Sequence, residues 1–390
     1  MKKTNPSPKK TTPSPKKTTE NKSSKPTTKA TSNLKPNKTA AKKKDEKKTK
    51  TEAKKEEKKP ANNNNNQNTE KATKTEEEEN PLSNMDIESN NTKEKNDEEL
   101  LKCVMTLSNH KDWVNKIIQL SNKSILSCSE DKTIKLWDLS ELPKRPTPID
   151  FIGHTDSVYD IIQYTADTIV SVSRDKTIRK WKLNGKEIYS FQTNSINLCL
   201  CQITDTFIAV GGTDNIIHVY DLSINENIQE VSELKGHLEQ INCLEYINAE
   251  TIASGSGDKT IKIWNHVKNE VIFTMEGHQL GVKCLKLLKD GRLASGSFDN
   301  TIKIWDLTRY TFDMTFDSDA GHIFCIQQLN DERLIVGTND WSISIWDYKE
   351  YKQDYSVDAH GEAVNTILVT QNYILSGSSD NKIKIWKLKE

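Results

Sequence analysis

The sequence lacks the long apolar runs and the cysteine pairs that mark membrane or secreted proteins. No apolar run approaches the roughly 18 residues that span a bilayer, and the start MKKTNPSPKK has charge but no apolar signal segment. The seven cysteines lie singly within apolar segments and form no CxxC pair. We therefore expect buried, reduced thiols, no zinc site and no membrane partner. These absences predict an intracellular protein, with the cytoplasm and the nucleus both left open.

Aromatic residues and cysteine are absent from residues 1–98, which consist almost entirely of Lys, Thr, Pro, Glu, Ser and Asn. So polar a segment buries too little apolar surface to offset the entropy of ordering it. We therefore expect a disordered low-complexity tail over 1–98 and a folded domain over 99–390. Residues 1–60 carry 21 Lys and no Arg against 6 acidic residues, whereas 61–100 carry 4 Lys against 11. The tail is thus basic over 1–60 and acidic over 61–98.

The tail repeats a Ser-Pro-Lys-Lys unit, in NPSPKK at 5–10 and TPSPKK at 12–17. The unit resembles linker-histone tails, and lysine density alone gives salt-sensitive affinity for phosphate. Weak nucleic-acid binding therefore stands beside a generic solvating or tethering role. Ser7 and Ser14 fit a proline-directed kinase, whose phosphate would lower the local positive charge. The run AKKKDEKKTK at 41–50 is a candidate nuclear import signal.

After residue 99 the chain repeats a segment such as SGSGDKTIKIWN or SGSFDNTIKIWD, with successive aspartates 39 to 44 residues apart. The seven turn aspartates are Asp131, Asp175, Asp214, Asp258, Asp299, Asp340 and Asp380. Each unit has the pattern of four short strands, which in the fifth unit are 282–288, 292–297, 301–307 and 310–316. One such sheet cannot bury both of its faces, but seven sheets stacked radially can. The period of about forty residues therefore predicts a propeller.

The repeat resembles the WD-repeat β-propeller family in the Gly-His that opens a unit and the Trp-Asp that ends its third strand. The resemblance covers residues 99–390 and implies an all-β, seven-bladed β-propeller. The last unit stops after its third strand, at 382–388. The segment LLKCVMTL at 100–107 is therefore predicted to supply the missing fourth strand of blade seven and to close the ring, as in members of the family.

A Ser, an Asp and a His within one unit are also the parts of a nucleophilic hydrolase. Here they recur with a Trp at the same relative positions in five units, and five identical active sites in one domain would be odd. The resemblance implies a buried hydrogen-bonded chain Trp–Ser–His–Asp, termed the brace below. The sequence therefore predicts no catalytic residue, no cofactor and no metal. The five sets are His110, Ser127, Asp131 and Trp137; His154, Ser171, Asp175 and Trp181; His237, Ser254, Asp258 and Trp264; His278, Ser295, Asp299 and Trp305; and His360, Ser376, Asp380 and Trp386.

Units three and six depart from the brace, because both lack its His and its Ser. The corresponding residues are Gln192, Val210, Asp214 and Tyr220 in unit three, and Asp319, Val336, Asp340 and Trp346 in unit six. Losing both together is coherent, since a buried hydroxyl without its imidazole would be unsatisfied. His322 follows three residues too late for the brace of unit six. We expect it to be a free histidine in the loop, either binding a partner or merely solvated.

The family binds partners chiefly on its top face, where the loops before the first strands and the turns between second and third strands converge around the central channel. At those positions aromatic and cationic residues concentrate in units five, six, one and two, and such residues typify binding hot spots. Units three, four and seven carry small or amide residues there, such as Ser195 and Asn197. The alternative is ordinary surface aromatics packed under their own loops. The predicted partner-binding residues are Trp113, Asn115, Tyr159, Arg174, Lys283, Phe298, His322, Phe324 and Trp341.

These features favour a non-catalytic scaffold or adaptor, a monomeric propeller that binds proteins or peptides within a larger complex. Two alternatives remain open. One is a substrate-recognition subunit of a ubiquitin ligase or a similar complex. The other is a chromatin- or RNA-associated factor that uses the lysine-rich tail.

Overall fold

The computed structural model describes residues 100–223, 228–330 and 332–389. The predicted tail, residues 1–98, lies outside the described residues together with Ser7, Ser14 and the candidate import signal. Within the described residues the regular secondary structure consists of 28 β-strands, with no helix. That part of the chain accordingly contains no helix long and apolar enough to cross a membrane.

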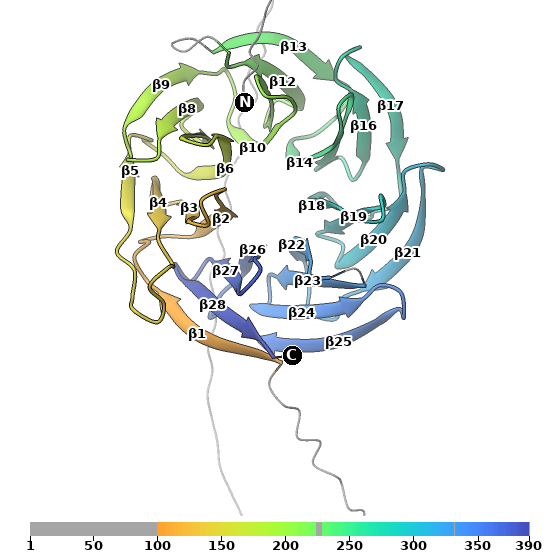
Figure 1. Cartoon of the computed structure of the whole chain (residues 1–390). Coiled ribbons are helices and arrows are strands. Elements are labelled where there is room, and N and C mark those ends of the chain that lie inside the picture. Colours follow the sequence, from red (N-terminus) through yellow and green to blue (C-terminus); the bar gives the residue numbers. More distant parts are fainter. Residues whose placement is uncertain (1–99, 224–227, 331, 390) are drawn as a thin grey trace, which may run out of the picture. The chain divides into compact units, whose positions relative to one another are not determined.

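The strands form seven four-stranded antiparallel sheets, the blades, arranged radially (Figure 1). Blades one to three contain β2 (Val114–Gln119), β3 (Ile125–Ser129), β4 (Thr133–Trp137) and β5 (Ile149–Ile152); β6 (Val158–Thr165), β7 (Thr168–Ser173), β8 (Thr177–Lys182) and β9 (Glu187–Gln192); and β10 (Asn197–Gln202), β11 (Phe207–Gly212), β12 (Ile216–Asp221) and β13 (Gln229–Lys235). Blades four and five contain β14 (Ile241–Asn248), β15 (Thr251–Ser256), β16 (Ile261–Asn265) and β17 (Glu270–Met275); and β18 (Val282–Leu287), β19 (Leu293–Ser297), β20 (Thr301–Asp306) and β21 (Thr311–Asp317). Blades six and seven contain β22 (Ile323–Gln328), β23 (Arg333–Thr338), β24 (Ser342–Asp347) and β25 (Lys352–Asp358); and β26 (Val364–Val369), β27 (Ile374–Ser378), β28 (Ile383–Leu388) and β1 (Leu101–Leu107). The seven-bladed, all-β propeller predicted from the repeat is confirmed.

Ring closure joins the two ends of the domain. Strand β1 pairs antiparallel with β28, from Leu101 opposite Leu388 to Leu107 opposite Ile383. Figure 1 shows β1 on the rim beside β28, as the fourth strand of blade seven. The prediction that 100–107 completes this blade is confirmed, and the closure is non-covalent.

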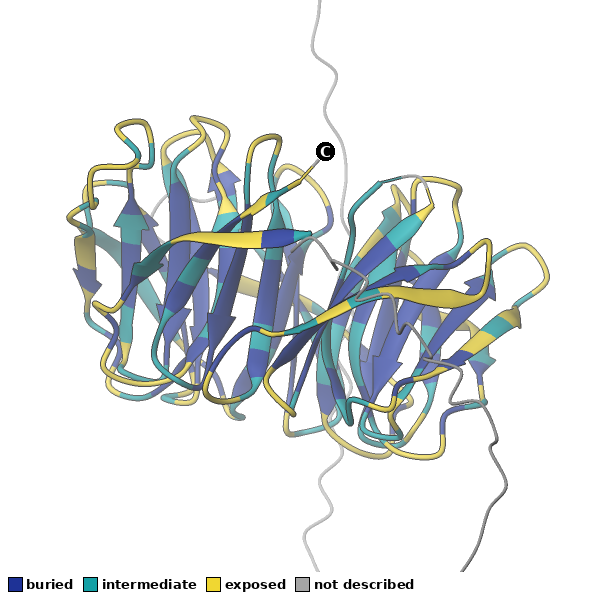
Figure 2. Ribbon diagram, turned by 90° about the horizontal axis from the view of Figure 1, so that it is seen from below, coloured by how far each residue is buried: buried dark blue, intermediate teal, exposed yellow. Residues whose placement is uncertain are grey.

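The hydrophobic core lies between the facing surfaces of neighbouring blades. Between blades four and five, for example, Ile261 and Ile263 belong to one buried cluster with Val282 and Trp305. Gly255 allows this stacking, since a Cβ there would lie 2.6 Å from a methyl group of Val282. Burial therefore concentrates on the inner strands of each blade, whereas the loops and outer strands such as β17 and β25 carry much of the exposed surface, as Figure 2 shows.

In blade three the alignment made from the sequence was wrong by one residue. Asn197 pairs with Gly212 as Val114 pairs with Ser129, so Asn197 takes the inward position that Ile196 was expected to hold. An amide tolerates burial there because its side chain donates to Thr193 Oγ1 over 2.9 Å, which an apolar pattern cannot reveal. Two corrections follow. Thr193 rather than Gln192 occupies the brace His position, and the top-face positions are Ile196 and Leu198 rather than Ser195 and Asn197.

Candidate functional site

The brace is a continuous hydrogen-bonded chain, seen clearly in blade four. The indole Nε1–H of Trp264 donates to Ser254 Oγ over 2.7 Å, and Ser254 Oγ lies 2.7 Å from His237 Nε2. His237 Nδ1 lies 2.7 Å from Asp258 Oδ2. Because a carboxylate only accepts, His237 donates through Nδ1–H and accepts the serine proton at Nε2. Each of these side chains of the brace therefore has a hydrogen-bond partner.

The same atoms make the same contacts in blades one, two, five and seven, at 2.7 to 3.0 Å. All five brace serines are fully buried. Each serine hydroxyl donates to its histidine and accepts from its tryptophan, so it has no access to a substrate. The structure thus brings all twenty predicted brace residues together, in five hydrogen-bonded sets of four.

The braces perturb the acidity of their own groups. Burial alone would raise the pKa of Asp258, but hydrogen bonds from His237, Thr260 and the Leu238 backbone outweigh it and hold that pKa well below its usual range. The other four brace aspartates shift in the same direction. Burial lowers the pKa of His154 and His360 despite the aspartates beside them. These two histidines are therefore neutral at neutral pH.

Blade six replaces the brace with local contacts. The Trp346 Nε1–H donates to Ser344 Oγ over 2.7 Å on the same strand, because Val336 stands where the five braced blades have serine. Asp340 accepts from the Ser342 hydroxyl over 2.9 Å within its own turn. The expectation that His322 is free is wrong, since its Nδ1 lies 2.8 Å from Asn300 Oδ1 of blade five.

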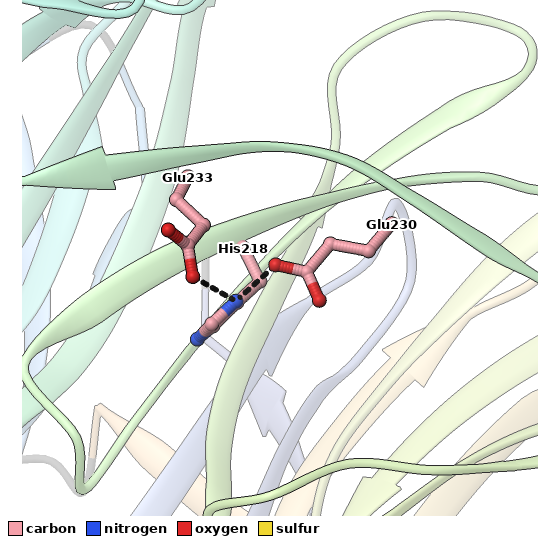
Figure 3. Close-up of side chains that lie close together, drawn as sticks. All are labelled: His218, Glu230 and Glu233. Atoms are coloured by element: carbon pink, nitrogen blue, oxygen red, sulfur yellow. Dashed lines mark hydrogen bonds and ion pairs between the residues drawn. The ribbon is translucent and has the colours of Figure 1, made fainter. Parts of the chain in front are cut away.

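Blade three turns its aspartate toward a residue that the sequence analysis missed. Asp214 Oδ2 lies 2.9 Å from His218 Nε2. On the other side of the ring, His218 Nδ1 lies 2.8 Å from Glu230 Oε1 (Figure 3). Burial lowers the pKa of His218, but hydrogen bonds to Asp214 and Glu230 outweigh it and raise that pKa to about 9. A signal existed in the sequence: His218 stands where other units have Lys, Arg or Ser.

Four of the predicted partner-binding residues form one cluster on blades five and six. The Phe298 ring meets the His322 and Phe324 rings edge-on, with centroids 5.6 Å and 6.0 Å away. The Lys283 ammonium lies 5.8 Å from the Phe324 centroid. These four residues are termed the aromatic cluster, and two of them, Lys283 and Phe324, also line the central channel. The brace needs none of them.

The two tryptophans that lie outside the third strands are exposed but separate from each other and from the aromatic cluster. Trp113 is 47% exposed and Trp341 is 52% exposed. Among the described residues no ring contact joins either one to the aromatic cluster. Trp341 adopts φ of 77°, the left-handed turn conformation that the other blades give to Lys or Asn. A bulky residue there is strained, so packing preference does not explain it.

The remaining three predicted residues differ in availability. The Asn115 amide donates to the Val158 carbonyl over 2.9 Å and ties blade one to blade two. Tyr159 is half-buried in the wall of the central channel, which Asn115 and Lys283 also line. Arg174 is exposed, 3.9 Å from the Asp156 carboxylate. The structure thus gives Asn115 a role in the fold that the sequence analysis did not foresee.

A hollow of about 550 Å³ beside Phe298 was missed, because blades three and four were expected to offer little. Its rim includes Leu238, which is 82% exposed, and Leu280, which is 45% exposed. Gly257 and Gly281 lie in contact within it, and a Cβ on Gly281 would lie 3.2 Å from the Gly257 Cα. Gly257 of blade four, which carries no side chain, thus helps to form the hollow together with Gly281 of blade five.

Comparisons with known proteins agree with this architecture. The family model described as WD domain, G-beta repeat matches residues 101–138, 146–182, 228–265, 269–306 and 351–387. The crystal structure of the WD40 beta propeller domain of Doa1 superposes with a TM-score of 0.67 at 20% identity, covering 74% of this chain and 98% of that one. At this identity the superposition concerns the fold alone.

Three relatives match over a short stretch of 68 residues, which is 17% of this chain. They are guanine nucleotide-binding protein subunit beta-1 of Caenorhabditis briggsae and subunit beta of Lymnaea stagnalis, both 34% identical, and the G(I)/G(S)/G(T) subunit beta-1 of Homarus americanus, 32% identical. The match covers 20% of the length of each relative.

Proposed function

This chain belongs to the WD-repeat β-propeller family, and from that premise we propose that it is a non-catalytic scaffold whose top face binds segments of partner proteins. The observation that carries the proposal is the aromatic cluster of Lys283, Phe298, His322 and Phe324. Aromatic residues close to a cation are typical of binding hot spots.

The surroundings of the cluster indicate the chemistry of the partner segment. The hollow beside Phe298, with Leu238 and Leu280 on its rim, suits one bulky apolar side chain. Among the described residues, no carboxylate lies within ion-pair distance of the Lys283 ammonium. A segment that carries an acidic residue close to an aromatic or aliphatic one would satisfy both features.

The non-catalytic part of the proposal rests on the hydrogen bonds that the Ser, His and Asp side chains make within the braces. Each Ser, His and Asp set that resembles a hydrolase triad has its hydrogen bonds directed within a blade, with a buried serine. All seven cysteines are free thiols, as is usual inside cells. We propose a monomeric propeller that works there within a larger complex.

The test is quantitative affinity purification with the double variant Phe298→Ala, Phe324→Ala. Tyr246→Ala is the matched control, because Tyr246 is an aromatic residue, 40% exposed, near the opposite end of blade four. We expect the double variant to lose its partners, the control to keep them, and both to melt like the wild type. Full retention by the double variant would remove the aromatic cluster as the binding site.

A further variant, Trp113→Ala, measures how far the site extends around the ring. Loss of the same partners would add blade one to the surface, whereas retention would confine it to the side of the aromatic cluster. Each purification is repeated after nuclease treatment. Partners recovered only from untreated extract would indicate association through nucleic acid and would contradict direct protein binding.

A further inference from the structure

A group of side chains of the kinds that bind metals lies on the outer strands of blade three. His218 projects from β12, and Glu230 and Glu233 project from β13 (Figure 3). His218 Nδ1 lies 2.8 Å from Glu230 Oε1 and 4.0 Å from Glu233 Oε1. One ligand atom from each of the three residues lies within 4.8 Å of the other two.

The backbone explains why both glutamates face the histidine. Glu230 and Glu233 are three residues apart, and strict alternation along a strand would place them on opposite faces of the sheet. The pairing of β12 with β13 contains a bulge between Val219 and Tyr220, so His218 lies opposite Glu233 while Tyr220 lies opposite Glu230. The extra residue turns both carboxylates toward the same face.

Other blades have the same geometry with different residues. Blades four and five carry Lys262 and Lys303 at the position of His218, and each ammonium donates over 2.8 Å to a threonine opposite. The full set of equivalents of His218 is Lys135, Arg179, Lys262, Lys303, Ser344 and Lys384. Among the described residues, a histidine facing two carboxylates replaces the lysine–threonine pair in blade three.

The fourth member of the group orients the imidazole. Asp214 Oδ2 accepts from His218 Nε2 over 2.9 Å, which leaves Nδ1 facing the two glutamates. A carboxylate on the second ring nitrogen is the usual outer partner of a metal-binding histidine. In five other blades this turn aspartate holds the brace histidine instead, so the missing brace of blade three frees Asp214 for this role.

The charges and distances also suit a cation. Asp214, Glu230 and Glu233 supply three negative charges, and Lys235 neutralises one through its contact with Glu233. A divalent cation in place of the Nδ1 proton would bring the group to zero. Ligand atoms around tetrahedral zinc lie roughly 3.3 Å apart, since each bond is about 2.0 to 2.1 Å. The separations of 2.8 Å and 4.0 Å bracket that value.

We propose that His218 Nδ1 and one carboxylate oxygen from each of Glu230 and Glu233 bind Zn²⁺, with Asp214 as the orienting residue. One imidazole with two carboxylates is a donor set that zinc accepts, with water in the fourth position. The glutamate side chains are 37% and 39% exposed, so the ion reaches them from solvent. The bound ion would cross-link β12 to β13 in a blade without a brace.

The test is calorimetric titration of the full chain with ZnCl₂, together with thermal melting and the visible spectrum of the Co²⁺ complex. The variant His218→Lys installs the residue that blades four and five use, and Glu233→Gln removes one ligand charge. His266→Gln is the control, because His266 is a buried histidine outside the cluster that bonds the Ala249 carbonyl. The tail adds no imidazole or thiol, since residues 1–99 contain no His or Cys.

We expect one equivalent of Zn²⁺ to bind the wild type and raise its Tm, and Co²⁺ to give a tetrahedral spectrum. Affinity should fall more than about tenfold in His218→Lys and in Glu233→Gln but not in His266→Gln. Absence of saturable binding to the wild type, or equal affinity and equal Tm shift in His218→Lys, would overturn the proposal. Circular dichroism of each variant establishes that a loss of binding is not a loss of fold.

Discussion

The five braced blades and the two unbraced ones solve the same packing problem differently. In blade four, Asp258 binds His237 from the loop that enters the blade, so second strand, third strand and loop are tied together. In blade three Asp214 binds His218 on its own third strand, and in blade six Asp340 binds hydroxyls of its own turn. The comparison teaches that the fold requires partners for the aspartate and for the indole of Trp346, but not the same partners in every blade.

The two unbraced blades are also where the chain departs from its family. The family model leaves residues 183–227 and 307–350 unmatched, and these stretches contain the inner three strands of blades three and six. Both places carry groups with no counterpart in the braced blades: the His218 cluster in one, and His322 of the aromatic cluster in the other. Release from the brace coincides with the appearance of residues available for binding.

The largest effect should come from removing the strand that completes blade seven. Deleting residues 1–107 removes β1 and exposes the edge of β28. It also removes Leu101 and Leu107, whose side chains fill two inter-blade clusters. We expect the domain to unfold, and blade seven's brace cannot prevent it. Circular dichroism and a thermal melt measure the outcome. Deletion of residues 1–90 is the control and should melt like the full chain; equal Tm for both truncations would refute ring closure as a requirement.

The next effect distinguishes a brace histidine from the histidine of an unbraced blade. His237→Ala leaves Asp258 and Ser254 without their shared partner, so the free energy of unfolding should fall by roughly 1 to 3 kcal/mol. His322→Ala removes one partly exposed contact to Asn300 and should cost less than about 0.5 kcal/mol. Urea unfolding measures both. Similar losses for the two variants would mean that the brace adds nothing specific to blade four.

A smaller effect tests the substitute contact of blade six. Ser344→Ala removes the acceptor of the Trp346 indole and leaves one buried N–H unpaired, for a loss of about 1 kcal/mol. Ser254→Ala in blade four should cost more, because Ser254 serves both Trp264 and His237. The same urea unfolding series measures the pair. If Ser344→Ala unfolded at the wild-type midpoint, the Ser344 contact would not be the replacement for the brace that the structure indicates.

Repetition made the fold predictable from the sequence. Seven in-phase aspartates and a missing last strand were enough to predict the blades and their closure by 100–107, because each unit repeats the same register. The aromatic cluster was predictable for a related reason: subtracting residues that recur in every unit leaves Phe298 and Phe324 unexplained by the fold.

What the sequence did not reveal depends on contacts that are not periodic. The register of blade three was misassigned because Asn197 is buried through a bond to Thr193, and polarity patterns assume an apolar residue there. The His218 cluster was missed because only the bulge in β13 brings Glu230 and Glu233 to one face. The hollow was missed because glycines carry no side-chain signal, and its shape follows from two of them lying against each other.

The smallest expected difference between braced and unbraced blades is in the pH dependence of stability, to which His154 and His360 of the braces contribute. Burial lowers the pKa of both histidines below the usual 6.5. Around His154, Asp175 and Glu187 oppose that shift, and Arg179 adds to it. Around His360, Asp380 opposes the shift, and Lys384 and Lys382 add to it. The unfolded chain therefore binds more protons below pH 6.5, and stability falls as the pH drops through that value. The brace aspartates, whose pKa is depressed from 3.8, add a second loss below about pH 4.

Blade six has no histidine at its brace position and contributes nothing to the first loss. A series of melts at constant ionic strength should therefore show a Tm that is highest near pH 6.5, with a shallow decline toward pH 5 and a steep one below about pH 4. Above pH 6.5 the Tm should also fall, because the pKa of His218 is raised to about 9 and its contribution to stability is lost as the pH rises through that value. His360→Gln, which cannot be protonated, should make the shallow decline smaller while lowering Tm at neutral pH. A decline of unchanged slope in that variant would show that the mild-acid effect does not arise in the brace of blade seven.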